Sequence, residues 1–141
     1  MLRTQHRALL KRRKLTPMLT ILVVDDNVQL QIAFKKILTS SQYNVELAGD
    51  GEEGLRLART IRPDVILLDM MLPKLSGLQV LLALKRDRAT ERIPVIALSG
   101  LPTSNDAKLR RDGAVSYLQK SNLEDQDVLL QAVEHALLFA P

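Results

Sequence analysis

The sequence predicts an α/β domain whose parallel sheet is doubly wound, with helices on both of its faces. Short apolar runs of strand length alternate along the chain with segments whose apolar residues recur at helical spacing. One run, Val65–Leu68, is continuously apolar and leads directly into Asp69, a pattern typical of a strand buried on both faces. Alternating strands and helices need crossover connections, and these connections produce a parallel sheet covered on both sides.

Two strand–helix units are expected in the first part of the chain. Leu19–Val24 is the first apolar run, and Asn27 is a suitable N-cap for a helix over Gln29–Leu38. Asn44–Ala48 is the second strand segment, and Gly51–Thr60 follows as a short helix with its apolar residues on one face.

The middle of the chain repeats this pattern. Asp64–Leu68 is the third expected strand, and Leu75–Lys85 has leucines at helical spacing. Pro94–Leu98 is the fourth strand segment. Ser104–Asp112 is expected to form a short polar helix, which Gly113 ends as a C-cap.

The last elements are a fifth strand over Ala114–Leu118 and a helix over Leu123–Leu138 with a long apolar stripe. Five strands connected in this way favour the order 2-1-3-4-5, the flavodoxin-like arrangement. The expected domain spans residues 19–141, and residues 1–18 form a basic, flexible extension before it.

The composition is that of a soluble globular protein, and it excludes several kinds of function. Hydrophobic residues make up 46% of the chain and charged residues 26%. The absence of cysteine excludes disulfides, thiol catalysis and cysteine-ligated metals. No apolar run approaches the ~18 residues of a membrane-spanning helix, so we expect a cytoplasmic protein without a membrane span.

The net charge of +4 arises from the N-terminal extension rather than from the domain. Residues 1–18 contain six of the 20 basic residues and no acid, so the remaining 14 basic and 16 acidic residues give a net charge of −2. An arm that binds nucleic acid or lipid head groups is an alternative to a flexible tail. The extension has no aromatic residue for base stacking and no second basic cluster supports it, so nucleic-acid binding is not expected.

Polar side chains follow four of the expected strands. Asp25 and Asp26 follow the first strand, Asp69 the third, Ser99 the fourth and Lys120 the fifth. Because parallel strands point their carboxyl ends to one edge of the sheet, we expect these side chains to converge. Each residue alone is an ordinary cap, turn or surface residue. The combination at four separate strand ends predicts a functional site.

Three carboxylates at close range repel one another, and a divalent cation relieves that repulsion. Oxygen ligands in an open site suit Mg²⁺, and also Mn²⁺. With its charge neutralised, Asp69 can act as a nucleophile toward a phosphoryl group, because carboxylates form aspartyl phosphates. Lys120 and the metal then balance charge on the phosphoryl oxygens, and the Ser99 hydroxyl can donate to one of them.

The ordered set resembles the receiver domain of the two-component response regulator family over about residues 19–138. The motifs that carry the resemblance are Asp25-Asp26, the segment Asp69–Gly77 with Pro73, Ser99, Tyr117 and Lys120. The resemblance implies a stand-alone, chemotaxis-regulator-like signalling protein, and not a turnover enzyme. It also implies that a histidine kinase or phosphotransfer protein donates the phosphoryl group. The output is then contact with a downstream protein, from a monomer or a phosphorylation-dependent dimer.

The resemblance also implies the ligands of the metal. Asp69 would be the phosphoacceptor and would bind Mg²⁺ directly, together with Asp26 and the backbone carbonyl of Met71. Asp25 would hold a metal-bound water.

The same resemblance assigns the remaining positions of the site. Lys120 would pair with the phosphoryl group, or with Asp69 before phosphorylation. Ser99 would be the switch hydroxyl, and Tyr117 the aromatic residue coupled to it. Pro73 and Gly77 would shape the loop below the site.

One departure from the family pattern keeps an alternative open. The family commonly has proline after the lysine that follows the fifth strand, whereas Ser121 follows Lys120 here. This difference favours a trans peptide and an altered loop, and it motivates the alternative of a protein-binding module that works without phosphorylation. A phosphohydrolase is not expected, because Met71 stands where such enzymes carry a second acid. A flavin site is also disfavoured, since the acidic first loop repels phosphate.

Overall fold

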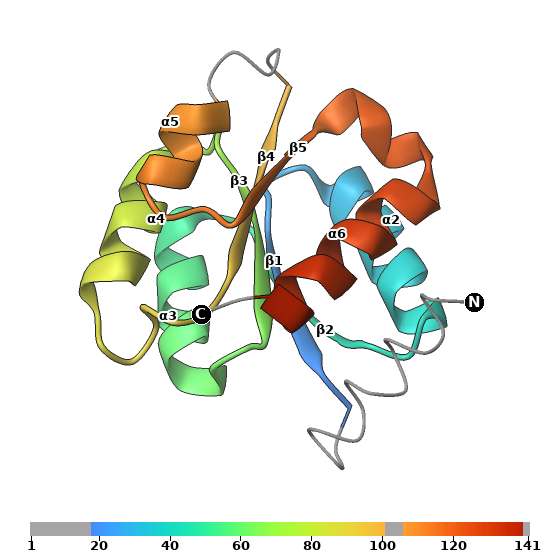
Figure 1. Cartoon of the computed structure of the whole chain (residues 1–141), viewed down its shortest axis with the longest axis horizontal. Helices are drawn as coiled ribbons and strands as arrows, with labels where there is room; N and C mark the ends of the chain where they lie inside the picture. The colour runs from blue at the N-terminus through green and yellow to red at the C-terminus, as the bar shows by residue number, and fades with distance from the viewer. Residues whose placement is uncertain (1–17, 101–105, 140–141) are drawn as a thin grey trace.

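The computed structural model describes residues 18–100 and 106–139, and these form a five-stranded parallel sheet covered by helices (Figure 1). The strand order is β2-β1-β3-β4-β5, as the sequence predicts. The predicted fold class is therefore confirmed. The strands are β1 (Thr20–Val24), β2 (Asn44–Ala48), β3 (Val65–Asp69), β4 (Val95–Ser99) and β5 (Ser116–Gln119).

Helices cover both faces of the sheet. Figure 1 shows α2 and α6 on one face and α3, α4 and α5 on the other. Helices α2, α3, α4 and α5 each return the chain to the edge at which the next parallel strand begins. The helices are α2 (Val28–Ser40), α3 (Gly51–Ile61), α4 (Gly77–Arg86), α5 (Asp106–Arg111) and α6 (Gln126–Phe139), with a short 3-10 helix, η2 (Lys120–Glu124), between β5 and α6.

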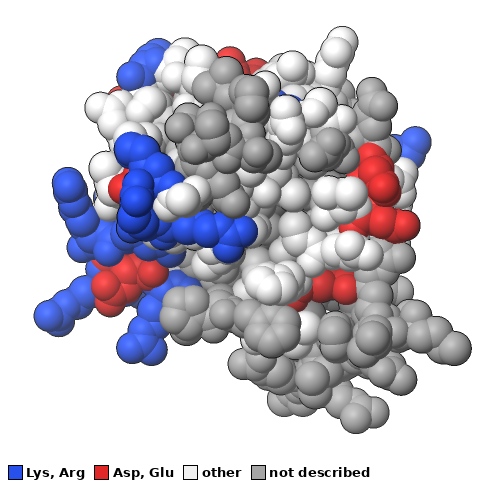
Figure 2. All heavy atoms as spheres, turned by 45° about the horizontal axis from the view of Figure 1, so that its top comes forward, with Lys and Arg blue, Asp and Glu red and all other residues white. Residues whose placement is uncertain are grey.

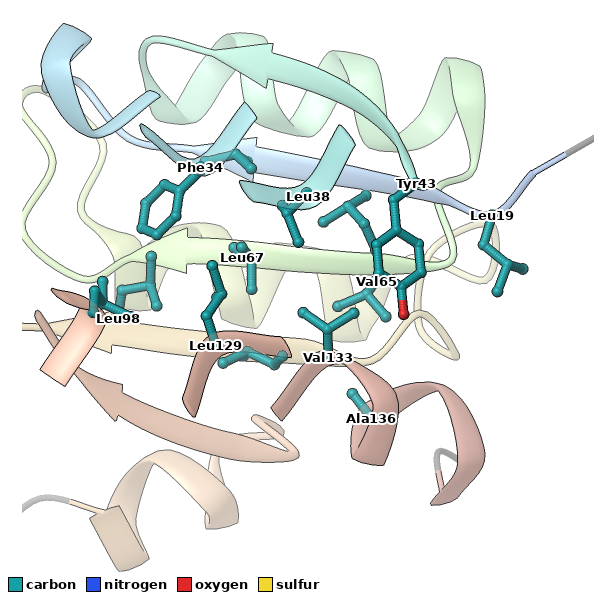
Figure 3. Close-up of a cluster of buried hydrophobic side chains, with 14 residues drawn as sticks. Leu19, Phe34, Leu38, Tyr43, Val65, Leu67, Leu98, Leu129, Val133 and Ala136 are labelled. Carbon is teal, nitrogen blue, oxygen red and sulfur yellow. The ribbon is translucent and has the colours of Figure 1, made fainter. Parts of the chain in front are cut away.

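The two faces of the sheet contribute to two separate apolar clusters. On β3, Val65 and Leu67 pack toward α2 and α6, whereas Ile66 and Leu68 pack toward α3 and α4. Figure 3 shows the first cluster, in which Leu67 and Leu98 from the sheet meet Leu129 from α6. All five residues of β3 are buried, so the strand is held from both sides up to its last residue, Asp69.

Several element boundaries differ from those predicted. Asp69 is part of β3 because it pairs with Leu98, and the N–H of Met70 donates to the Leu98 carbonyl at 2.9 Å. Helix α4 begins at Gly77, because Ser76 and Gln79 form a reciprocal capping box. The last helix begins at Gln126 rather than Leu123, since the residues before it form η2. Residues 104 and 105 of the predicted polar helix, and residues 1–17 of the predicted extension, lie outside the described residues.

Basic side chains gather where α3, α4 and α5 end, a cluster that the sequence analysis did not detect. Figure 2 shows this concentration on the side of the molecule that carries α4 and α5. Arg59 of α3 is bonded to Asp87 after α4 at 2.8 Å, and the side chain of Lys85 lies against Gly113 after α5. Positive charge at helix C-termini complements the helix dipoles. The exposed members of this basic cluster are Arg59, Arg62, Arg86, Arg88, Arg92, Lys108, Arg110 and Arg111.

Candidate functional site

The carboxyl edge of the sheet brings together the polar residues that were predicted to converge. Asp25 directly follows β1, Asp69 and Ser99 end β3 and β4, and Lys120 directly follows β5. The side chains of the first three residues are buried, whereas that of Asp26 is exposed. The base of the site is therefore formed by buried residues at the strand ends, and the site opens to solvent beside Asp26.

Three carboxylates lie within reach of a single ion. One oxygen from each of Asp25, Asp26 and Asp69 lies within 4.8 Å of the others. The N–H of Asn27 donates to Asp25 Oδ1 at 2.9 Å, and the N–H of Met71 donates to Asp69 Oδ1 at 3.0 Å. These backbone contacts fix the orientation of both buried carboxylates. The Met71 side chain itself is 67% exposed beside the site.

Lys120 is the cation of the site. Its Nζ lies 2.9 Å from Asp69 Oδ2 and 3.4 Å from Asp25 Oδ2. Partial burial disfavours the charged ammonium, but the hydrogen bond and charge of Asp69, together with the charge of Asp25, outweigh it and raise the pKa of Lys120. Lys120 therefore stays protonated at neutral pH. It reaches both carboxylates although Ser121, in η2, follows it in place of a proline.

The negative charge of the Asp25 carboxylate is disfavoured by its surroundings. Burial raises the pKa of its carboxyl group, and the neighbouring charge of Asp69 adds to this effect, against the opposing contributions of Asn27 N–H and Lys120. Asp25 Oδ2 is buried, and its contact among the described residues is the ion pair with Lys120 Nζ at 3.4 Å, without a short hydrogen bond. A buried carboxylate oxygen without a short hydrogen bond, next to two further carboxylates, fits a hard divalent cation such as Mg²⁺.

The raised pKa of Asp25 predicts a pH-dependent gain in stability for Asp25→Asn in the absence of metal. Since the native pKa lies above the ordinary value of 3.8, the native protein binds this proton more tightly than the unfolded chain does. The contribution of Asp25 to the free energy of unfolding therefore falls as the pH rises from the ordinary pKa of 3.8 through the higher native pKa. It stays low at neutral pH. In EDTA, Asp25→Asn is expected to raise the melting temperature at pH 7, with a smaller gain below pH ~4.

Thermal unfolding followed by circular dichroism at both pH values measures this difference. Added MgCl₂ is expected to stabilise the wild type more than the variant, because ligands that bind only the native state stabilise it. A variant that melts at a lower temperature than the wild type at pH 7 in EDTA would contradict this account of Asp25.

Ser99 and Tyr117 lie on adjacent strands. In the register of β4 with β5, Ser99 pairs with Gln119 and Ala97 pairs with Tyr117. The backbone of Tyr117 is thus one strand away from Ser99 and two positions further from the carboxyl edge. Its half-buried ring packs against the cluster between the sheet and α3–α5. Ser99 therefore lies at the carboxyl edge of the sheet with Asp69, whereas Tyr117 lies further from that edge, along β5.

Two further residues support the site. The side-chain amide of Gln31 donates to the backbone carbonyls of Asp25 and Ala48, at 2.6 and 3.4 Å. A glutamine on a helix carries no sequence signal for such a role, so the sequence analysis missed it.

Gly77 was assigned by resemblance to the loop below the site. The structure shows a physical reason, because a Cβ there would overlap the carbonyl oxygen of Asp69 and the Cα of Met70.

The comparisons with known proteins agree on one family. Residues 21–134 match the profile described as the response regulator receiver domain. The polar-differentiation response regulator DivK of Brucella anthropi is 36% identical over 102 residues, which are 72% of this chain and 83% of DivK.

Solved structures of receiver domains superpose closely on this chain. A response regulator receiver domain from Clostridium thermocellum matches with a TM-score of 0.78 and 31% identity, covering 86% of this chain and 95% of that one. The chemotaxis response regulator CheY4 of Vibrio cholerae matches with a TM-score of 0.79 and 26% identity, covering 86% and 100%. Both the sequence and the fold place the chain with these signalling proteins, and the chain belongs to the response regulator receiver domain family.

Proposed function

We propose that this protein accepts a phosphoryl group on Asp69 from a histidine kinase or phosphotransfer protein, in the presence of Mg²⁺, and signals through contact with a downstream protein. One observation carries the proposal. Asp69 is 1% exposed, lies within 4.8 Å of two other carboxylates and is bonded to Lys120 at 2.9 Å. This arrangement combines a fixed nucleophile with the positive charge that a transferring phosphoryl group requires.

The residues that would hold the metal are Asp26 and Asp69, with the backbone carbonyl of Met71, and Asp25 would bind it through a water. The grouping of the carboxylates and the buried Oδ2 of Asp25 support this assignment. When bound, Mg²⁺ would supply positive charge toward the phosphoryl oxygens, and Mn²⁺ has the same ligand preference.

In the proposed transfer, a carboxylate oxygen of Asp69 attacks the phosphorus atom. The P–N bond of the donor phosphohistidine breaks, the new P–O bond forms, and the histidine nitrogen leaves with its electron pair. Met71 N–H holds the carboxylate in one orientation, which lowers the entropic cost of attack. Lys120 is within reach of a phosphoryl oxygen on Asp69, and the Ser99 hydroxyl at the adjacent strand end can donate to another.

Output in this proposal is a shift between two populations of the surface around α5, β5 and α6. Ser99 and Tyr117 lie on β4 and β5 of this region, so a hydrogen bond that draws Ser99 toward the phosphoryl group can be transmitted to Tyr117. The target would be a protein, bound by a monomer or by a phosphorylation-dependent dimer.

Location and domain division are also part of the proposal. Among the described residues, no helix has the length and apolar character of a bilayer crossing. We propose a cytoplasmic location, and a division into a basic extension over residues 1–18 and a receiver domain over residues 19–141.

Incubation with acetyl phosphate tests the proposal directly. Intact mass spectrometry is expected to show one phosphoryl adduct with MgCl₂ and none with EDTA, because the carboxylates repel the donor without a cation. Beryllofluoride should shift the NMR resonances of residues around Ser99 and Tyr117 under the same conditions. An absence of adduct and of shifts in MgCl₂ would overturn the proposal.

The alternative is a receiver-like module that binds its partner without phosphorylation, and Ser121 at the usual proline position is the observation that favours it. This alternative predicts that a captured partner binds equally with and without beryllofluoride. The proposed function predicts that binding depends on it.

A further inference from the structure

The backbone of Asp25 is held at both of its polar groups. Its N–H donates to the carbonyl of Ala48 at 3.0 Å, and its carbonyl accepts from Gln31 Nε2 at 2.6 Å. The same Nε2 lies 3.4 Å from the Ala48 carbonyl. Asp25, Ala48 and Gln31 thus form a closed hydrogen-bonded unit, which we call the Gln31 clamp.

The Gln31 clamp connects three elements at the carboxyl edge. Gln31 is on α2, Asp25 follows β1, and Ala48 is the last residue of β2. β2 supplies no carboxylate to the site. The carbonyl of its last residue, Ala48, instead accepts hydrogen bonds from Asp25 N–H and Gln31 Nε2. The backbone of the acidic loop is consequently tied on one side to β2 and on the other to α2.

The direction of the acidic side chains depends on this backbone. Rotation about the backbone bonds of Asp25 would move both its carboxylate and that of Asp26, the next residue. The Asp25 side chain has two further contacts: Oδ1 accepts from the N–H of Asn27 at 2.9 Å, and Oδ2 lies 3.4 Å from Lys120 Nζ. The Gln31 clamp therefore holds the backbone from which the carboxylates of Asp25 and Asp26 project, whereas Asn27 and Lys120 contact the side chain of Asp25 itself.

We propose that Gln31 is a positioning residue for the divalent cation, and that its amide sets the affinity of the acidic loop for Mg²⁺ without touching the ion. This inference rests on the proposed metal site and adds a residue to it. Residues that orient metal ligands change metal affinity by ~10–100-fold when they are replaced. Methionine has nearly the shape of glutamine but cannot donate to the two carbonyls, so Gln31→Met removes the clamp and preserves the packing.

Isothermal titration of the purified full chain with MgCl₂ alone tests the inference. Gln31→Met is expected to weaken Mg²⁺ binding by about tenfold or more. Gln29→Met is the matched control, because Gln29 is exposed on the same helix and its side chain makes no hydrogen bond with the described residues. Gln31→Ala is a second variant, which removes the amide without adding apolar volume.

A readout on the metal-free protein separates positioning from simple stabilisation. In EDTA, Gln31→Met is expected to accelerate hydrogen exchange at Asn27, whose N–H donates to Asp25 Oδ1, more than at the core amides of β3. Uniform acceleration at both places, with unchanged Mg²⁺ affinity, would show a purely structural role and overturn the inference.

The wild type distinguishes this inference from the proposed function. If the wild-type chain binds no Mg²⁺ and forms no phosphoryl adduct, the proposed function fails. If the wild type binds Mg²⁺ and both Gln31 variants bind it equally well, the proposed function stands and the role of Gln31 is wrong.

Discussion

Asp69→Asn is expected to abolish phosphorylation by acetyl phosphate while the protein remains folded. An amide has no anionic oxygen with which to attack phosphorus, and the substitution keeps the size of the side chain. Stability is not expected to fall, because the substitution removes one of two buried carboxylates that repel each other. Intact mass spectrometry after incubation in MgCl₂ is expected to show no adduct above background, against one per chain in the wild type.

Asp50→Asn provides the matched control for this experiment. Asp50 lies at the same edge of the sheet and accepts from the N–H of Glu53 at 2.8 Å as the N-cap of α3. Asparagine caps helices as well as aspartate does, so this variant is expected to keep both the fold and the adduct. An adduct of equal yield in Asp69→Asn would mean that a different residue is the phosphoacceptor.

Gly77→Ala is expected to destabilise the protein by ~1–3 kcal/mol, although alanine is the better helix former. Gly77 is the first residue of α4, and a Cβ at this position would overlap backbone atoms of Asp69 and Met70. Backbone cannot move aside as a flexible side chain can, so α4 or the end of β3 must shift. Urea unfolding followed by circular dichroism is expected to show a lower midpoint with an unchanged slope.

The contrasting substitution is Gly100→Ala, on the other side of the site. Among the residues that the structure describes, no atom lies within 4 Å of a Cβ placed on Gly100. Its φ is not in the left-handed region, so alanine is accommodated without strain and is expected to stabilise the protein by ~0.4–1 kcal/mol. Equal midpoints for the two variants would contradict the close contact between α4 and the end of β3.

Much of this architecture could be predicted because the sequence repeats a simple physical pattern. An apolar run such as Val65–Leu68 has no solvated face, which requires helices on both sides of its sheet. Once the strands are parallel, their carboxyl ends share an edge, and residues as far apart as Asp25 and Lys120 must converge there. The structure brings these two residues together at 3.4 Å. The catalytic and ligand roles of the residues at this edge remain predictions.

The parts that were not predicted depend on geometry that the residue type does not carry. Gln31 is one of several polar residues on α2, and only the folded backbone shows that its amide reaches Asp25. Element boundaries were displaced where local hydrogen bonding decided them, as at Ser76, whose capping box starts α4. The basic cluster was missed because its residues come from three separate segments of the sequence, each with only a few basic residues interspersed with acids.

The basic cluster has a consequence for how partners approach. Helices α3, α4 and α5 run opposite to the strands, so their positively charged ends lie at the edge away from Asp25, Asp26 and Asp69. The described part of the chain therefore has exposed basic residues at one edge and a carboxylate cluster at the other, and the electric field of these groups differs between the two edges. A charged partner is turned by this field before it touches the surface, which increases the fraction of productive encounters. Since the screening length is ~10 Å at 0.1 M salt, encounter rates with charged partners are expected to fall as ionic strength rises.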